Sequence, residues 1–198
     1  MRTWKREGGT KGSGADDSRI CSQLDAHEVE LLISMVTSMC DLFAEREATA
    51  PVDELAEITG IRTGHSDAPT DVTMGRLLPD FHRPDQDREL GADVVNGKLN
   101  AALRSVNEPT ILDAKKAAAQ VVLDTVPRGG GRVALTEEQA QSWLMALNDV
   151  RLALGAMLAI DEDTPDQLPP DHPHAAHLDV YHWLTVMQEL LVEALMRA

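Results

Sequence analysis

Cysteine is scarce in this chain of 198 residues, which has only Cys21 and Cys40. Two thiols provide neither a disulfide framework nor the ligand pairs of a zinc finger, and they favour a reducing compartment. The apolar runs are interrupted by polar residues well before the ~20 needed to cross a bilayer. The first residues lead into a polar, glycine-rich stretch, so no signal peptide is recognisable. These absences predict a cytoplasmic protein that does not span a membrane.

Signatures of catalysis are also lacking. The glycine runs at 8–9 and 129–131 have neither the Lys-Ser/Thr of a phosphate-binding loop nor the GxGxxG of a dinucleotide site. Ser66 follows Gly64 and His65 without the GxSxG pattern of a nucleophile elbow. We therefore expect a binding protein that is not an enzyme and uses no cofactor.

One cluster of histidines leaves an enzymatic alternative open. His172, His174 and His177 lie close together, and imidazole is a common ligand of zinc and iron. Their spacing lacks an i, i+4 pair, and the HExxH motif is absent. A junction between a loop and a helix explains the cluster more simply, so a metal-dependent hydrolase is retained only as an alternative and no metal ligand is assigned.

Aromatic residues make up only 3% of the chain. Trp143, Trp183, Phe43 and Tyr181 fall on helical stripes, which favours packing in a core over stacking on nucleic-acid bases. Trp4 alternates with charged neighbours, so one face of the first strand is expected to pack on helices.

Positive charge is in short supply, and the net charge is -15. Phosphate neutralisation by lysine and arginine supplies most nonspecific affinity for nucleic acids, so this balance opposes broad DNA binding. The charge is nevertheless uneven, because residues 98–132 sum to +3 while 21–97 sum to -11. Within this central segment Arg104, Lys115 and Lys116 are the candidates for contact with DNA or another anion, although a solvated helix face is the more common explanation of such residues.

Three short extended segments predict a small antiparallel sheet. Segments 3–7 and 18–22 flank a glycine-rich loop, as the strands of a hairpin do. A third strand at 132–135 follows the glycine turn and would join this hairpin, which is marginal alone.

The remainder of the chain is expected to be helical. Capping boxes at Asp25–Glu28 and Thr136–Gln139 predict helices at 25–43 and 136–157. Further helices are expected at 51–59, 72–78 and 180–195, and Pro109 is expected to restart a helix that begins near Leu99 and ends before Pro127. We predict a mainly α protein: a bundle of about five helices with a small sheet, forming a single domain at 1–198. Its parts are a hairpin at 1–23, helices with an acidic loop at 61–93 within 25–126, and a strand and two long helices at 132–198.

The two cysteines are the redox candidates. If the strand ending near Leu24 folds back along the first helix, Cys21 lies ~10 Å from the junction and Cys40 ~24 Å along the helix. A disulfide requires Cα atoms within about 7 Å, so an intramolecular bond would need rearrangement. Cys40 is expected to be a small buried hydrophobe, whereas Cys21 is the candidate for a disulfide across a homodimer.

The chain resembles an actinobacterial family described as a domain of unknown function and associated with an oxidative stress transcriptional regulator. The segments that carry the resemblance span nearly the whole chain: WKR (4–6), DEL (53–55), TGI (59–61), RLLPDF (76–81), NAALR (100–104), DTVP (124–127), WLMALNDVRLALG (143–155), HP (172–173) and YHWLT (181–185). The resemblance implies control of transcription under oxidative stress.

Residue chemistry and resemblance together lead to three hypotheses. The first is a transcription regulator that acts mainly through protein contacts, with RNA polymerase or a sigma factor, and with local contact to promoter DNA. The second is an adaptor in stress response or protein turnover, without a genomic target. The third is the metal-dependent hydrolase that uses the cluster from His172 to His177.

Overall fold

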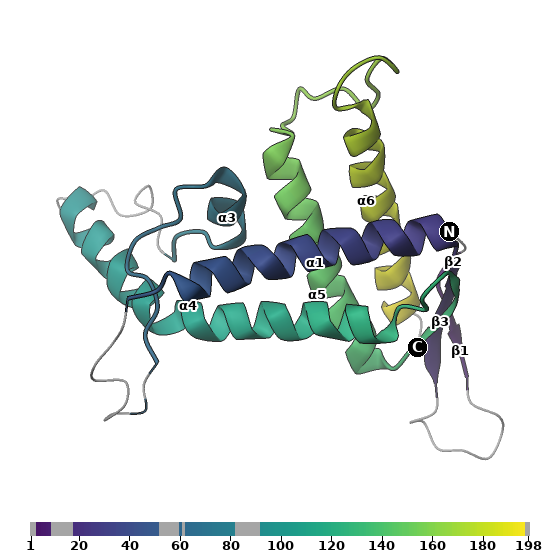
Figure 1. Cartoon of the computed structure of the whole chain (residues 1–198), viewed down its shortest axis with the longest axis horizontal. Coiled ribbons are helices and arrows are strands. Elements are labelled where there is room, and N and C mark those ends of the chain that lie inside the picture. The colour runs from purple at the N-terminus through teal and green to yellow at the C-terminus, as the bar shows by residue number, and fades with distance from the viewer. Residues whose placement is uncertain (1–2, 9–17, 52–59, 61, 82–91, 197–198) are drawn as a thin grey trace. The chain divides into compact units, whose positions relative to one another are not determined.

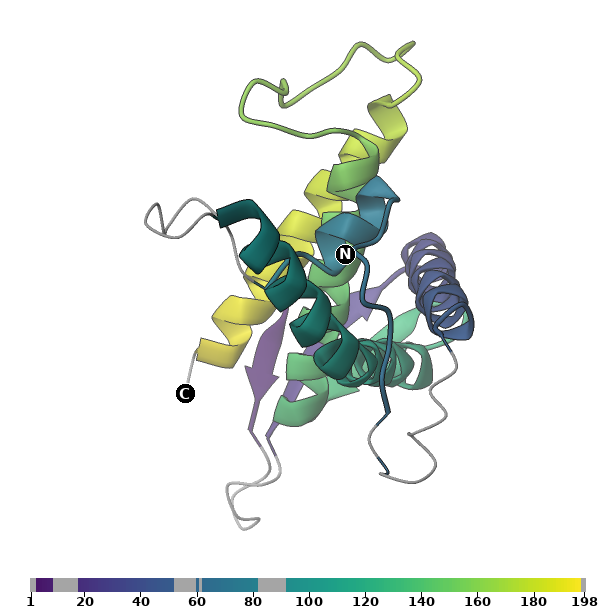
Figure 2. The ribbon, with the colours of Figure 1, turned by 90° about the vertical axis from the view of Figure 1, so that its left-hand side faces the viewer.

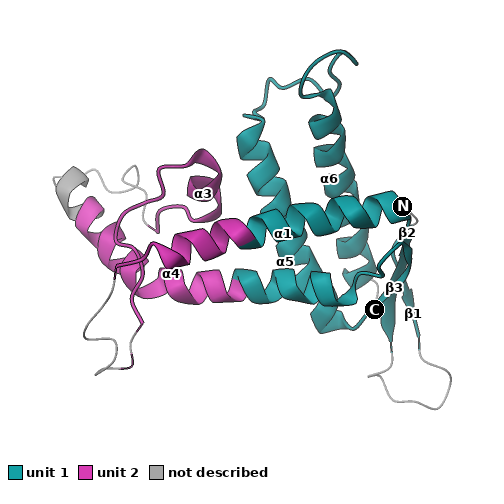
Figure 3. Cartoon of the chain, in the orientation of Figure 1, with its two compact units in different colours: residues 1–40, 115–198 teal, residues 41–114 magenta. Residues whose placement is uncertain are grey.

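The computed structural model describes residues 3–8, 18–51, 60, 62–81 and 92–196, with side chains in the last range from residue 97 onward. These residues belong to two compact units, one formed by 1–40 and 115–198 and the other by 41–114 (Figure 3). The chain passes from one unit to the other within helix α1 (Ala26–Ala48) and again within helix α4 (Ala92–Thr125).

Five helices and three strands make up the described part of the chain, which confirms a mainly α protein with a small sheet (Figure 1). In chain order they are β1 (Lys5–Glu7), β2 (Arg19–Leu24), α1 (Ala26–Ala48), α3 (Val72–Leu77), α4 (Ala92–Thr125), β3 (Gly131–Leu135), α5 (Glu137–Met157) and α6 (Ala175–Met196). No helix among the described residues is long and apolar enough to cross a membrane.

The sheet of the first unit is antiparallel, as predicted, and its strand order is β1-β2-β3. Lys5 pairs with Cys21, and Cys21 pairs in turn with Ala134. The turn before β3 requires glycine, because Gly130 has a φ of +88° and a Cβ there would lie 2.7 Å from the backbone nitrogen of Ala26. Both hairpin strands and the third strand are thus present, within two residues of the predicted bounds.

One face of the sheet packs on the helices, as the alternation around Trp4 predicted. Trp4 is buried and makes an edge contact with Trp143 of α5, with 5.6 Å between the ring centroids. Nε1 of Trp143 donates a hydrogen bond to the hydroxyl of Thr125, so this buried indole is satisfied. These tryptophans are core residues.

Both predicted capping boxes are present. The Asp25 carboxylate accepts from the backbone nitrogen of Glu28, whose carboxylate accepts from that of Asp25, both at 2.9 Å. Thr136 and Gln139 make the equivalent pair at the start of α5. Helices α5 and α6 lie side by side in opposite directions, joined by the loop after Met157 (Figures 1 and 2). Local sequence alone therefore sets these helix starts.

Helix α4 differs from the prediction. It runs without interruption from Ala92 to Thr125 and contains Pro109, which was expected to restart a helix. The stripe that begins at Leu99 is also not the buried face, since Leu99 is 42% and Val106 is 55% exposed. The helix predicted at 51–59 and residues 82–91 of the acidic loop lie outside the described residues.

Candidate functional site

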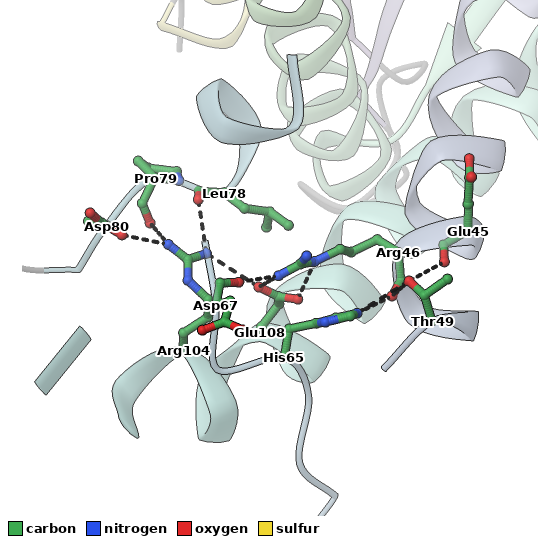
Figure 4. A network of polar contacts seen from close by, with 10 residues as sticks. All are labelled: Glu45, Arg46, Thr49, His65, Asp67, Leu78, Pro79, Asp80, Arg104 and Glu108. Carbon is green, nitrogen blue, oxygen red and sulfur yellow. Dashed lines mark hydrogen bonds and ion pairs between the residues drawn. The ribbon is translucent and has the colours of Figure 1, made fainter. Parts of the chain in front are cut away.

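The second unit contains a buried network of charged side chains (Figure 4). Glu108 on α4 accepts hydrogen bonds from Arg46 on α1, at 2.8 Å from Nε and 3.2 Å from Nη2. Arg104, one helical turn before Glu108, approaches the same carboxylate at 3.3 Å. The side chains of Arg104 and Glu108 are each only 2% exposed. Two guanidinium groups therefore share one buried carboxylate.

The arginines also hold the irregular segment 62–81 by its backbone. Arg104 donates to the carbonyl oxygens of Leu78 at 3.0 Å and Pro79 at 3.3 Å, and to the carboxylate of Asp80 at 2.8 Å. Arg46 donates to the carbonyl of Asp67 at 2.6 Å. Carbonyls that no regular secondary structure would satisfy thus acquire charged donors.

A histidine adds a further connection at the end of α1. Nε2 of His65 donates to the carbonyl oxygen of Arg46 at 2.8 Å and lies 3.4 Å from the hydroxyl of Thr49 (Figure 4). Arg62, at the start of the same segment, pairs with Asp113 on α4 at 2.5 Å. Segment 62–81 is therefore tied to both helices at several points.

Burying such a network contributes little net stability, because desolvation of the charges offsets most of their attraction. We expect the network to favour one conformation, since each guanidinium has a fixed fork of donors that matches a particular set of oxygens. We therefore expect the network to order segment 62–81, in which only Val72–Leu77 is helical. A surface that is already ordered loses less entropy when a partner binds.

Arg104 and Lys115, two of the candidates for contact with DNA, form ion pairs within the protein. Arg104 lies in the buried network, and a contact with phosphate would require its bonds to Glu108 and Asp80 to break. Lys115 pairs with the buried carboxylate of Asp149 at 2.6 Å. Lys116 is half-buried. Contact of these residues with DNA stays a prediction.

Asp149 lies in the first unit, on α5, and its carboxylate is almost fully buried. Desolvation by burial raises the pKa of Asp149 above its ordinary value, and the hydrogen bond and charge of Lys115 partly oppose this rise. Lys115 therefore opposes the protonation that burial favours at this carboxylate.

The two cysteines are both free thiols, with different surroundings. Cys21 is buried on β2, and Nη2 of Arg132 on β3 lies 3.3 Å from its sulfur. The hydrogen bond with Cys21, with added attraction from the sulfur and from Glu7, raises the pKa of Arg132. Cys40 on α1 is half-buried, more accessible than the sequence suggested. A disulfide between two copies through Cys21 would require this thiol to become exposed, and it stays a prediction.

The histidine cluster gives no support to a metal site. The rings of His172 and His174 lie 5.6 Å apart, and those of His174 and His177 lie 6.2 Å apart. Nδ1 of His172 accepts a hydrogen bond from the backbone nitrogen of His174, as expected at a loop-to-helix junction. Within the described ranges, no three His, Cys, Asp or Glu side chains are arranged to hold a metal ion.

Sequence reasoning singled out Arg104 but missed its partners Arg46 and Glu108. Glu108 follows Arg104 by four residues, a spacing that brings two side chains together on a helix. That signal was available, but it does not distinguish an exposed pair from a buried one. Arg46 is distant in sequence and gave no local sign of its role.

The chain belongs to a known family. The family model for domain of unknown function DUF2017 matches residues 1–195, and the chain is a member of that family. A protein of Mycobacterium tuberculosis named oxidative stress regulator AosR is 50% identical over 198 residues, covering 99% of this chain and 88% of the relative. A Mycobacterium bovis protein of the same name has the same identity and coverage. No solved structure is significantly similar to the chain.

Proposed function

We propose that this protein is a regulator of transcription under oxidative stress that acts mainly through contacts with RNA polymerase or a sigma factor. The observation that carries the regulatory role is the 50% identity, over nearly the whole chain, to proteins named oxidative stress regulator AosR. The matched region covers both units, so we expect the relatives and this chain to share one fold.

Action through protein contacts is supported by the pairing of positively charged side chains within the protein. The central segment 98–132 is the only stretch beyond residue 20 with a positive sum. Two of its cations, Arg104 and Lys115, are taken up by Glu108 and Asp149. This pairing reduces the number of cations available to release counterions from DNA, and acidic residues outnumber basic ones by 33 to 18 in the chain. DNA contact is therefore local and secondary in this proposal.

Chromatin immunoprecipitation from cells with and without peroxide tests the regulatory role. We expect enrichment at promoters that depends on peroxide. Absence of promoter enrichment in both conditions would contradict the proposal and favour an adaptor without a genomic target.

Binding assays with purified components distinguish recruitment to a promoter through protein contacts from direct binding to promoter DNA. We expect the protein to bind RNA polymerase holoenzyme or an isolated sigma factor in the absence of DNA. Binding to promoter duplex alone, with a steep loss of affinity as salt increases, would instead show that DNA contact dominates. Stoichiometric zinc or iron in the purified protein would reopen the hydrolase alternative.

A further inference from the structure

A groove in the second unit lies between the end of α1 and the segment that leads into α3. It has a volume of about 370 Å³. Its apolar lining residues, Leu42, Pro69 and Met74, are buried or half-buried. The exposed residues at its rim are Glu45, Thr49, Thr70 and Asp71. The groove therefore combines an apolar floor with a polar, acidic rim.

The charge of this groove is negative in spite of an arginine in its wall. Arg46 lines the groove, but its guanidinium is committed to Glu108 and to the carbonyl of Asp67 (Figure 4). The carboxylates of Glu45 and Asp71 are therefore not balanced by Arg46. The surrounding unit adds to this field, since residues 41–114 contain fifteen acidic residues and seven lysines and arginines.

The residues that form the walls of the groove are held in place by hydrogen bonds within the protein. The carboxylate of Asp71 caps α3 by accepting from the backbone nitrogen of Met74 at 2.8 Å. The bond from Arg46 to Asp67 fixes the opposite end of the segment that carries Pro69. A preorganised groove loses little entropy on binding, which favours affinity.

We propose that this groove binds a lysine or arginine side chain from an amphipathic, basic segment of a protein partner. The aliphatic stem lies on Leu42, Pro69 and Met74, and the cation lies between Glu45 and Asp71. Val72, which is 71% exposed beside the rim, offers an apolar contact to a neighbouring side chain of the same segment. The inference rests on the proposed function for the existence of a protein partner and names the chemistry that this partner presents.

The experiment uses the full-length, isotope-labelled protein and a short synthetic peptide of alternating lysine and leucine. We expect the amide signals of Leu42, Glu45 and Asp71 to shift first in NMR titrations. A peptide with glutamate in place of lysine should leave them unchanged. Shifts that centre elsewhere on the protein, or no localised shifts at all, would overturn the inference.

Matched variants test the two carboxylates. Glu45→Gln combined with Asp71→Asn removes both charges, and asparagine preserves the cap of α3. We expect this variant to bind the lysine-leucine peptide about tenfold more weakly. Glu30→Gln, on the exposed face of the same helix outside the groove, serves as the control and should bind as the unmodified protein does. Equal affinities for all three proteins would refute the assignment.

Other occupants give different results. If a second copy of the chain fills the groove, the same signals shift on concentration without peptide. If DNA fills it, a short duplex shifts them and competes with the peptide. Either result overturns the inference. The promoter experiment is independent of these titrations, so failure of the groove and failure of the regulatory role are distinguishable.

Discussion

The backbone nitrogen of Gly64 donates a hydrogen bond of 2.7 Å to the carbonyl oxygen of Ser105. Ser105 lies four residues before Pro109, which has no N–H to offer to that carbonyl. Gly64 thus supplies the donor that the proline lacks, and α4 continues through Pro109 without leaving the acceptor unpaired. The proline ring and the irregular segment fit each other because Gly64 has no side chain.

Gly64→Ala should destabilise the second unit. A Cβ at this position would lie 3.0 Å from Cδ of Pro109, closer than carbon atoms normally pack. We expect a loss of about 1–2 kcal/mol in the free energy of unfolding, measured by urea denaturation. Pro109→Ala removes the opposing ring, so the double variant should recover part of the loss. A double variant no more stable than Gly64→Ala would show that the ring contact is not the cause.

Glu108→Gln should loosen the segment held by the arginines. A neutral amide leaves the buried guanidinium groups of Arg46 and Arg104 without their shared counter-charge. We expect a loss of about 3 kcal/mol and faster hydrogen exchange at the amides of 66–80. Glu45→Gln, an exposed change on α1, is the control and should leave both measurements unchanged. Slow exchange retained in Glu108→Gln would show that the network does not order this segment.

Lys115→Met should make stability depend more strongly on pH. Burial already raises the pKa of Asp149 above 3.8, and the substitution removes the two effects of Lys115 that lower it. The folded state would then hold this proton to higher pH than the unfolded chain, so stability would fall as pH rises through that interval. We expect little loss near pH ~4 and about 3 kcal/mol near neutrality.

Denaturation curves at several pH values provide this measurement. Lys98→Met, at an exposed position on α4, should show no such trend. NMR titration of the Asp149 carboxyl group should show directly that its pKa rises in Lys115→Met. A loss of stability that is the same at every pH would argue against the pairing as the source.

The two thiols should differ in reactivity. Cys40 is half-buried, whereas Cys21 is buried beneath its neighbours on the sheet. We expect iodoacetamide to modify Cys40 faster than Cys21 in the folded protein, as followed by mass spectrometry. Arg132→Gln should speed the modification of Cys21 if this side chain shields the sulfur. Faster reaction at Cys21 in the unmodified protein would indicate that β2 opens readily.

The predicted disulfide-linked dimer can be tested with the same residues. Non-reducing electrophoresis after peroxide treatment should show a cross-linked species that Cys21→Ser abolishes and Cys40→Ser retains. Cross-linking that persists in Cys21→Ser would assign the bond to Cys40, the more accessible thiol.

The sequence by itself determined those local features whose interactions lie close together along the chain. The capping boxes at Asp25 and Thr136 place two helix starts because all their bonds lie within four residues. The alternation of Trp4 with charged neighbours likewise identified the face of the sheet that packs on helices, because successive side chains of a strand point to opposite faces. Net charge and the absence of catalytic motifs led us to expect a binding protein. The resemblance to a known family is confirmed by the matched family model.

Only the tertiary structure decided how residues distant in sequence are used. In the sequence, Pro109 predicts an interrupted helix. In the structure the helix continues, because the backbone nitrogen of Gly64, 45 positions before Pro109, donates a hydrogen bond to the carbonyl oxygen of Ser105. Nothing in the sequence distinguishes Arg104 and Lys115 from exposed cations. In the structure Arg104 pairs with the buried Glu108, and Lys115 pairs with the buried Asp149. Burial and pairing arise from contacts across the fold, and they determine whether a charge faces a partner or holds the protein together.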